Sequence, residues 1–251
     1  MKVKAYHSRL VKNRDRIEDV IASTLPYLAE RSVVVIASKI VSTCEGRFVP
    51  KLTGEKREKY ELVKKEAEFW LPATLSKYEL MLTVKRNWMF VNAGIDESNA
   101  DNQYILWPKD PQASADKIWQ FLRTHYKVNE VGVIISDSAS RPFNWGVVGQ
   151  GIAHCGFQPL YSYIGKPDLF GREMKMEQVN IVQSLTTAAV YEMGEGDESQ
   201  PLAVVEDLPK VEFMDRPPTA EELDALHISI EEDAYAPILE KAPWQKGEGG
   251  I

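Results

Sequence analysis

Three expected strands end in residues that can bind a metal ion or a phosphate group. The run VVVIASK ends in Ser38 and Lys39, and WMFVNAGID ends in Asp96. The run VGVIISDS delivers Asp137 and Ser138. Ligands of open α/β sheets bind at the carboxyl ends of strands, where carboxylates can hold Mg²⁺ and a lysine can hold phosphate as a point charge. A single aspartate more often caps a turn or a helix, but the recurrence at three strand ends favours a metal and phosphate site.

Other catalytic patterns do not occur in the sequence. The chain has four histidines, His7, His125, His154 and His227. Their spacing matches neither HxxxH nor HExxH, which argues against a zinc site, and no GxSxG marks a hydrolase nucleophile. The segment GVVGQG resembles a phosphate loop only superficially, because it lacks the GK[ST] ending. We expect Cys44 and Cys155 to be buried free thiols.

Composition and charge exclude several classes of protein. The chain has 251 residues, of which 44% are hydrophobic and 27% are charged. It contains no apolar run near the ~20 residues of a membrane span and no apolar stretch of a signal peptide, so we expect a cytoplasmic protein with no membrane partner. Of the net charge of −7, residues 215–251 carry −6. The nearly neutral remainder has no basic stripe for nucleic acid, and it can still bind a small anionic substrate.

The periodicity of apolar residues alternates between helical and strand spacing, which predicts a mixed α/β (α+β) fold. Asp110 and Pro111 are expected to begin a helix, as cap and first-turn residue. Helices are expected over 15–29 with a break at Pro26, over 55–71, from 110 to 126 and over 178–193. Strands are expected over 32–38, 78–84, 88–94, 131–137 and 201–207, with a glycine-rich connection over 145–156 and a turn over 165–173.

The acidic segment 214–251 is expected to be a partly helical tail that follows a body of residues 1–213. Thr219 with Glu222 and Ser229 with Glu232 have the spacing of capping boxes, which satisfy the free amide groups at the start of a helix. The terminal KGEGGI is expected to fray.

Four blocks of the sequence resemble, in order and spacing, the signature blocks of the gamma-glutamyl ligases that extend the deazaflavin coenzyme F-420. The blocks are VVIASKIVSTCEGR, VNAGIDESN, VGVIISDSASRP and AAVYEMGEG, within residues 8–205. The resemblance implies one ligase domain over 1–213, with two intertwined lobes and mixed sheets, and a homodimer with its sites at the subunit interface. It also implies an amide bond between L-glutamate and a carboxylate acceptor, formed through an acyl phosphate with GTP or ATP. Mg²⁺ or Mn²⁺, as two ions, is the implied cofactor, with K⁺ as a further candidate.

The resemblance also implies roles for particular residues. Metal ligands fall on Asp96, Asp137, Ser138 and Glu195. Nucleotide contacts fall on Arg9, Leu10, Val11, Lys12, Ser38, Lys39, Thr43 and Asn99, and on the stretch 193–200 with Met193, Gly194 and Gly196. Lys39 and Arg141 are the candidate catalytic cations, Arg141 as a fork for phosphate or carboxylate. Metal ions and cations can stabilise phosphoryl oxygens without any protein nucleophile.

The sequence departs from the family pattern at positions that could contact the base, the acceptor or the incoming amino acid. Thr43 replaces a lysine, Asn144 replaces a second arginine, and Gln183 with Ser184 replaces an acidic pair. We therefore expect a folate-like, deazaflavin-like or glutamyl acceptor, as in a bacterial folate-type or polyglutamate-forming branch. The α or γ linkage and the choice between GTP and ATP stay open. The alternative is a nucleotide-binding sensor that kept the metal pocket without ligation.

Overall fold

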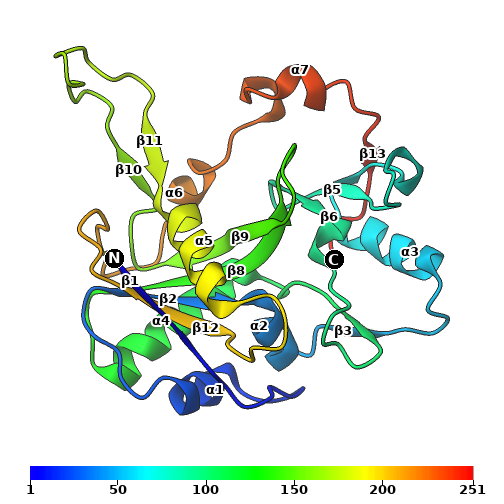
Figure 1. Ribbon diagram of the computed structural model, residues 1–251, viewed down its shortest axis with the longest axis horizontal. Coiled ribbons are helices and arrows are strands. Elements are labelled where there is room, and N and C mark those ends of the chain that lie inside the picture. Colours follow the sequence, from blue (N-terminus) through cyan, green and yellow to red (C-terminus); the bar gives the residue numbers. More distant parts are fainter. Residues whose placement is uncertain (251) are drawn as a thin grey trace.

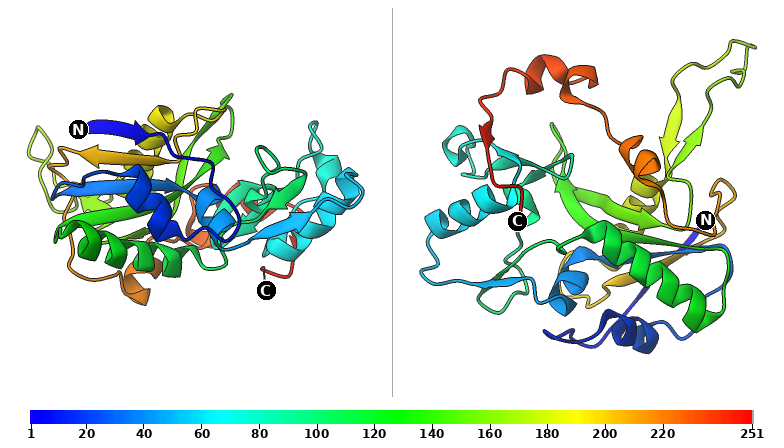
Figure 2. Two further views of the ribbon diagram at one scale, coloured as in Figure 1. Left: turned by 90° about the horizontal axis from the view of Figure 1, so that it is seen from below. Right: turned by 180° about the vertical axis from the view of Figure 1, so that it is seen from behind.

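A computed structural model describes residues 1–250. The chain forms a large lobe and a small lobe, which lie side by side in Figure 2. The large lobe is built on a five-stranded sheet of order β1-β12-β2-β8-β9. These strands are β1 (Lys2–Tyr6), β12 (Leu202–Glu206), β2 (Ser32–Ala37), β8 (Val131–Ser140) and β9 (Val147–Cys155). Strands β2 and β8 run parallel and the other neighbours antiparallel, which confirms the expected mixed α/β fold.

Helices cover both faces of the large sheet (Figure 1). Helices α1 (Ile17–Thr24), α2 (Ser38–Cys44) and α4 (Pro111–Tyr126) share one apolar cluster with the sheet, and α5 (Ile181–Met193) shares the other. Val34 and Ile36 of β2 join the first cluster, while Val33 and Val35 join the second. A continuous apolar run is typical of a strand that is buried on both faces, and this explains the sequence of β2.

The start of α4 confirms the expected cap. The Asp110 carboxylate accepts hydrogen bonds from the backbone N–H groups of Gln112 and Ala113, each at 3.1 Å, and Pro111 occupies the first turn. Both features stabilise a helix start, because they satisfy or remove amide donors that lack a partner within the helix.

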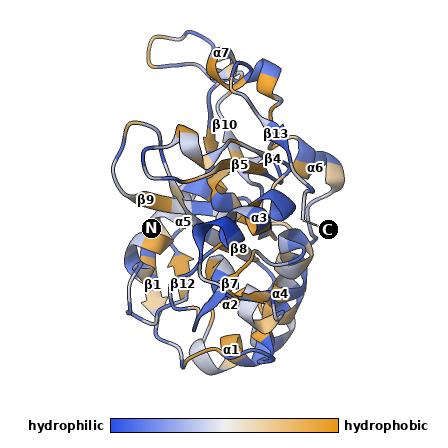
Figure 3. Cartoon of the chain, turned by 90° about the vertical axis from the view of Figure 1, so that its right-hand side faces the viewer, coloured by the Kyte–Doolittle hydropathy of each residue, from blue (hydrophilic) through white to orange (hydrophobic). Residues whose placement is uncertain are grey.

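The small lobe contains a four-stranded antiparallel sheet of order β13-β4-β5-β6. Its elements are α3 (Lys56–Glu66), β4 (Phe69–Trp70), η1 (Ala73–Leu75), β5 (Leu82–Lys85), β6 (Trp88–Val91), η2 (Asn92–Gly94) and β13 (Gln245–Lys246). Strands β3 (Phe48–Pro50) and β7 (Gln103–Ile105) pair separately beside it. Its apolar cluster includes Val63, Met81 and Tyr104, and most of α3 is hydrophilic, as Figure 3 shows.

A buried group of charges ties α3 to β5. The Lys85 ammonium lies 2.7 Å from Glu66, and the Arg47 guanidinium lies 3.2 Å from the same carboxylate. Lys85 is 4% exposed and Glu66 is 6% exposed. Burial lowers the pKa of Lys85, and the charge of Glu66 opposes this effect. The interior of the small lobe thus contains a group of buried ion pairs, whereas the interior of the large lobe is packed with apolar side chains.

Most of the segment 145–156, expected as a glycine-rich connection, forms strand β9 (Val147–Cys155) instead. A Cβ atom added to Gly149 would lie 2.5 Å from the Thr186 carbonyl oxygen, and one added to Gly151 would lie 2.5 Å from the Val182 side chain. The prediction was wrong because these glycines allow α5 to pack closely on the strand, so they do not mark a loop.

Three expected helices have other boundaries. The helix expected over 15–29 is α1, which ends at Thr24, before Pro26. The helix expected over 55–71 ends at Glu66, because Phe69 and Trp70 pair with β5. The helix expected over 178–193 begins at Ile181, where Asn180 caps it. Residues 178–180 form β11 (Gln178–Asn180), which pairs with β10 (Leu160–Ser162) in an arm that projects from the large lobe (Figure 1).

The tail runs from the large lobe to the outer edge of the small lobe (Figure 2). It leaves the large lobe where Met214 N donates to Gly156 O at 2.8 Å, and it ends in β13. Between these points lie α6 (Ala220–Asp224), η3 (Ile230–Glu232) and α7 (Ala236–Leu239). The capping box of Thr219 and Glu222 is confirmed, whereas the Ser229 side chain makes no capping bond, so that prediction was wrong.

Residues 246–250 are bonded to α3 and β4, so the fraying expected for them was also wrong, while Ile251 lies outside the described residues. Gly247, Glu248 and Gly250 donate their backbone N–H groups to the carbonyls of Glu68, Lys64 and Lys65, at 2.8, 3.0 and 2.8 Å. Carbonyls at a helix C-terminus lack partners within the helix, and here the tail supplies them. The division at 213/214 into body and tail stays a prediction. Within residues 1–250, no helix combines the length and the apolar character that a membrane crossing requires.

Candidate active site between the two lobes

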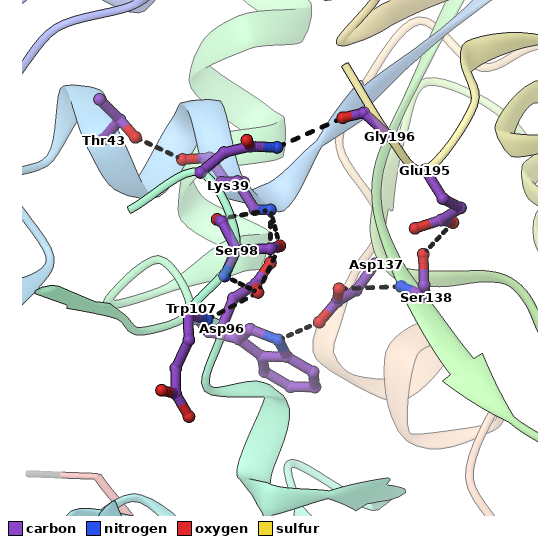
Figure 4. A network of polar contacts seen from close by, with 11 residues as sticks. Lys39, Thr43, Asp96, Ser98, Trp107, Asp137, Ser138, Glu195 and Gly196 are labelled. Carbon is purple, nitrogen blue, oxygen red and sulfur yellow. Dashed lines mark hydrogen bonds and ion pairs between the residues drawn. The ribbon is translucent and has the colours of Figure 1, made fainter. Parts of the chain in front are cut away.

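Four segments of the chain bring polar side chains together between the lobes (Figure 4). Lys39 lies in the first turn of α2, Asp96 follows η2, Asp137 lies in β8, and Glu195 follows α5. Because β2 and β8 are parallel, with Ala37 opposite Ser136, the residues that follow these positions emerge at the same edge of the sheet. The strand expected over 131–137 is longer than predicted: β8 continues past Asp137 to Ser140, because it stays paired with β9 through to its last residue.

Asp96 forms an ion pair with Lys39 at the small-lobe side of the site. The Lys39 Nζ atom lies 2.5 Å from Asp96 Oδ2 and 3.0 Å from Ser98 Oγ. The other oxygen, Oδ1, accepts from Ser98 N at 3.0 Å, Ser98 Oγ at 2.8 Å and Glu97 N at 2.7 Å. Burial raises the pKa of Asp96, but the bond and charge of Lys39 and the bonds from Ser98 outweigh it, so the pKa is lowered. The contacts with Lys39 and Ser98 therefore favour the ionised form of Asp96.

Asp137 lies at the large-lobe side and has neutral partners. The indole N–H of Trp107 donates to Asp137 Oδ2, and the backbone N–H of Ser138 donates to Oδ1 at 2.8 Å. Burial raises the pKa of Asp137 to about 6, and the nearby charge of Asp96 adds to this effect while the two hydrogen bonds oppose it. The two aspartates of one site thus have pKa values shifted in opposite directions.

Glu195 and its neighbours join the site to the end of α5. The Ser138 hydroxyl donates to Glu195 Oε1 at 2.5 Å, and the Asn99 side-chain amide donates to Gly196 O at 3.3 Å. The loop that contains Asn99 therefore contacts the loop that contains Glu195 and Gly196.

The residues expected to bind metal supply oxygen atoms alone. Within residues 1–250, no three histidine, cysteine, aspartate or glutamate side chains form a preassembled cluster for an ion. Mg²⁺ typically keeps several waters and binds one or two carboxylates together with substrate phosphates, so it does not require such a cluster. Carboxylate and hydroxyl oxygens are the ligands that Mg²⁺ and Mn²⁺ prefer, and the donor set fits these ions.

The segment Arg9–Lys12, expected to contact nucleotide, connects β1 with α1. The Arg9 guanidinium pairs with Asp15 at 2.6 Å, and Leu10 is 80% exposed. Val11 packs against the first apolar cluster. The backbone N–H of Ser8 donates to Ser199 O at 2.9 Å, which brings this segment beside the expected stretch 193–200.

The other expected nucleotide residues lie at the ends of helices. Ser38 is buried at the start of α2, beside Lys39. Met193 is buried in the second apolar cluster at the end of α5, and Gly194 and Gly196 follow it. Asn99 contacts Gly196, so these segments meet at one side of the site.

Arg141 follows β8 and bonds to the facing strand. Its guanidinium donates to the side-chain oxygen of Gln150, which lies opposite Asp137 in the sheet. Gln150 is 1% exposed, and within residues 1–250 its Nε2 atom has no hydrogen-bond partner. Because Gln150 lies opposite Asp137, its bond to Arg141 keeps the guanidinium near the part of β8 that contains Asp137.

The positions that depart from the family pattern make other contacts. Thr43 Oγ1 donates to the Lys39 carbonyl within α2 at 2.7 Å, and the Asn144 amide donates to Pro142 O at 3.0 Å. The Gln183 amide bonds to both the N–H and the carbonyl of Gly151, each at 2.9 Å, and so it covers the free edge of β9. Ser184 Oγ donates to Asn180 O at 2.8 Å. None of these hydrogen bonds involves Asp96 or Asp137.

Three residues of the site were missed by the sequence analysis: Ser98, Trp107 and Gln150. Ser98 could have been found, because an aspartate followed two residues later by serine is typical of a turn closed by the aspartate side chain. Trp107 has no such local signal, since its partner Asp137 lies on a distant segment of the chain. Gln150 bonds to Arg141 across the β8–β9 hairpin, but it lies in a segment that was expected to be a connection.

Comparison with known proteins identifies relatives over most of the chain. The family model for F420-0:gamma-glutamyl ligase matches residues 6–207. The coenzyme F420:L-glutamate ligase of Methanocaldococcus jannaschii is 35% identical over 186 residues, which cover 74% of this chain and 73% of the relative. The enzyme of the same name from Methanopyrus kandleri is 33% identical over 225 residues, which cover 83% and 88%. Both organisms are archaea, which argues against the bacterial branch considered from the sequence.

Proposed function

The chain belongs to the F420-0:gamma-glutamyl ligase family, and we propose that it joins L-glutamate to a carboxylate acceptor at the expense of GTP or ATP. The observation that carries the proposal is the convergence of Lys39, Asp96, Asp137 and Glu195 from four separate segments. All four lie within the residues that the family model matches.

The chemistry of amide formation explains the need for charges of both signs. A carboxylate is a poor electrophile, so an oxygen of the acceptor carboxylate first attacks the terminal phosphorus and the nucleoside diphosphate leaves. The glutamate amine then attacks the acyl carbon, phosphate leaves and the amine loses a proton. Lys39, held by Asp96 and Ser98, is placed to neutralise phosphoryl oxygens during both steps. Arg141 supplies a second cation, as a planar fork.

The same proposal assigns the divalent ion to the oxygen-rich part of the site. Asp96, Asp137, Ser138 and Glu195 would hold Mg²⁺ or Mn²⁺, as two ions. When bound, such ions neutralise charge on the phosphates of the nucleotide. The Ser138 hydroxyl already orients Glu195, so these two side chains would act together.

We also propose a homodimer, which the surface of the β10–β11 arm supports. Leu169, Phe170 and Met176 on this arm are 99%, 96% and 84% exposed. Large apolar side chains that are exposed on one projecting arm are typical of protein contacts. Light scattering of the purified chain measures its mass in solution. The mass of a monomer at micromolar concentration would contradict the dimer.

One assay tests the ligase proposal. The protein is incubated with Mg²⁺ or Mn²⁺, GTP or ATP, L-glutamate and a panel of folate-like, deazaflavin-like and glutamyl acceptors. We expect phosphate release that depends on glutamate, and a product heavier by one glutamyl residue in mass spectrometry. D-glutamate in place of the L-isomer is the matched control. Tight nucleotide binding without any adduct and without stimulation by glutamate would favour the sensor instead.

A further inference from the structure

Trp107 contacts the candidate site from the boundary between the lobes. It lies between β7 and α4, is 2% exposed, and packs in a small apolar cluster with Phe90 of β6 and Ala139 of β8. Its indole N–H donates to Asp137 Oδ2 (Figure 4). Building on the proposed function, we propose that Trp107 is a positioning residue that orients the Asp137 carboxylate for a divalent cation.

The indole is held in place from several sides. The Phe90 ring lies edge-on to it, with 4.8 Å between ring centroids and 87° between planes, and the Lys85 ammonium lies 5.2 Å above it. Gly94, at φ +69°, lies directly against the N–H group: a Cβ atom there would be 2.1 Å from Trp107 Nε1. Arg47 Nε donates to the Trp107 backbone carbonyl at 3.0 Å. The direction of the indole N–H is therefore fixed by its surroundings.

This fixed donor leaves Asp137 with capacity for a cation. Each carboxylate oxygen can accept two hydrogen bonds or ligand contacts. Trp107 uses one position on Oδ2, and the Ser138 N–H uses one on Oδ1. One position on each oxygen therefore remains for a ligand contact. The two hydrogen bonds set the plane of the carboxylate, and because both donors are neutral they do not compete electrostatically with a cation. Groups that orient a metal ligand in this way typically change metal affinity 10–100-fold.

Trp119 provides a matched control within the same chain. It is 3% exposed, and its indole N–H donates to the Val131 carbonyl at 2.9 Å. It belongs to the first apolar cluster, with α4 and the large sheet. Replacing Trp119 with Phe removes an equally buried indole donor without changing a contact of Asp137.

The experiment measures Mn²⁺ binding to the full chain by electron paramagnetic resonance of the free ion, without nucleotide or acceptor. We expect Trp107→Phe to weaken Mn²⁺ binding about 10–100-fold, and Trp119→Phe to leave it at the wild-type value. Benzothienylalanine at position 107, which replaces the N–H with sulfur and keeps the ring shape, should weaken binding as Trp107→Phe does. It also provides the test if Trp107→Phe fails to fold.

The outcomes separate this proposal from the proposed function. Wild-type affinity in a folded protein that lacks the indole N–H would overturn the positioning role and leave the ligase proposal intact. Equal weakening by Trp119→Phe would also overturn it, because the effect would then come from general loss of packing. A wild-type protein that binds no Mn²⁺, yet forms the glutamyl adduct with Mg²⁺, would overturn the positioning role alone. A wild-type protein that neither binds Mn²⁺ nor forms the glutamyl adduct would contradict the proposed function itself.

Discussion

The two lobes are stabilised differently, although each supplies an aspartate to the site. The large lobe buries apolar side chains on both faces of one sheet, with helices over each face. The small lobe has a smaller apolar cluster, a hydrophilic helix, and the buried charges of Glu66, Lys85 and Arg47. Strand β4 and the end of helix α3 are bonded to the tail. The small lobe therefore depends on polar contacts that the large lobe does not need.

The same contrast appears in the site. Asp96, from the small lobe, has an ammonium partner and a lowered pKa, whereas Asp137, from the large lobe, has neutral partners and a raised pKa. Residue type alone therefore does not set the charge of a side chain in the site. The pKa values of the two aspartates shift in opposite directions because each lobe places different chemical groups beside its own aspartate. Changes in either lobe should then affect function in distinguishable ways.

The largest expected effect comes from removing the large-lobe carboxylate. Asp137→Asn should lower nucleotide turnover by more than about 10³-fold, or about 4 kcal/mol, while the protein stays folded, because a neutral amide is a poor ligand for Mg²⁺. Asp96→Asn should act similarly, and the double variant should be little worse, since residues that act as a unit are not additive. Steady-state kinetics and circular dichroism measure both properties.

The control for this comparison is Asp110→Asn, because asparagine caps a helix as well as aspartate does. It should keep wild-type turnover. Near wild-type turnover in folded Asp137→Asn would remove this residue from the metal site and leave Asp96 as the principal carboxylate.

The second effect concerns the ion group of the small lobe. Glu66→Gln should destabilise the protein by about 3 kcal/mol, because it leaves the charges of Lys85 and Arg47 buried without a counter-charge. The matched control is Glu79→Gln, which breaks the exposed pair with Lys56 and should change stability little. Urea denaturation measures both. Equal effects from the two variants would show that burial of the ion group contributes nothing.

The third effect is a loss of stability in the small lobe alone when the end of the tail is removed. Deleting residues 245–251 should cost the small lobe about 1 kcal/mol, the usual scale of a lost helix cap, because the last carbonyls of α3 lose their partners. Hydrogen exchange should become faster in α3 and β4 and stay unchanged in α4. Deleting 215–251 should still leave the large lobe folded. Uniformly faster exchange in both lobes would contradict the distinction between them.

The smallest effect is the pH dependence of one loop in the small lobe. Glu58 accepts backbone N–H bonds from Leu52, Thr53 and Gly54, and these bonds, with that of Leu52 the largest, lower its pKa to about 2. A lowered carboxylate pKa contributes stability that is present above pH 4.5 and is lost as the pH falls towards 2. Glu58→Gln should therefore lower the melting temperature slightly at pH 6 and not at pH 2. A constant difference at both pH values would exclude this cause.

Local features of the structure could be predicted from the sequence, because their partners lie within a few residues. The Asp110 cap bonds to groups two and three residues away, and the apolar run of β2 reflects burial on both faces. Lys39 and Asp96 were expected as strand-end residues, but their ion pair joins positions far apart in the chain. The partnership of Trp107 and Asp137 had no signal, because it depends on how the lobes meet.

Two of the failed predictions concern glycines and share a physical cause. Gly149 and Gly151 suggested a loop, yet they are needed where α5 approaches β9. The terminal glycines suggested fraying, yet their N–H groups donate to carbonyls in the last turn of α3 and in the two residues that follow it. Ser229 has the spacing of a capping box, but only a single 3₁₀ turn follows it. For these glycines, tertiary contacts decided a conformation that composition alone left open.

The path of the tail gives β13 a high effective concentration at its binding site. The strand contributes two residues to the sheet, fewer than a free peptide would need to bind stably in water. Its connection to the large lobe through residues 214–244, about 100 Å when fully extended, makes the pairing intramolecular. Such covalent attachment raises the effective concentration of the strand at its pairing site above that of a free peptide in solution. The contact of β13 with β4 is thus maintained by covalent attachment, and a peptide of the same residues supplied separately would not replace it.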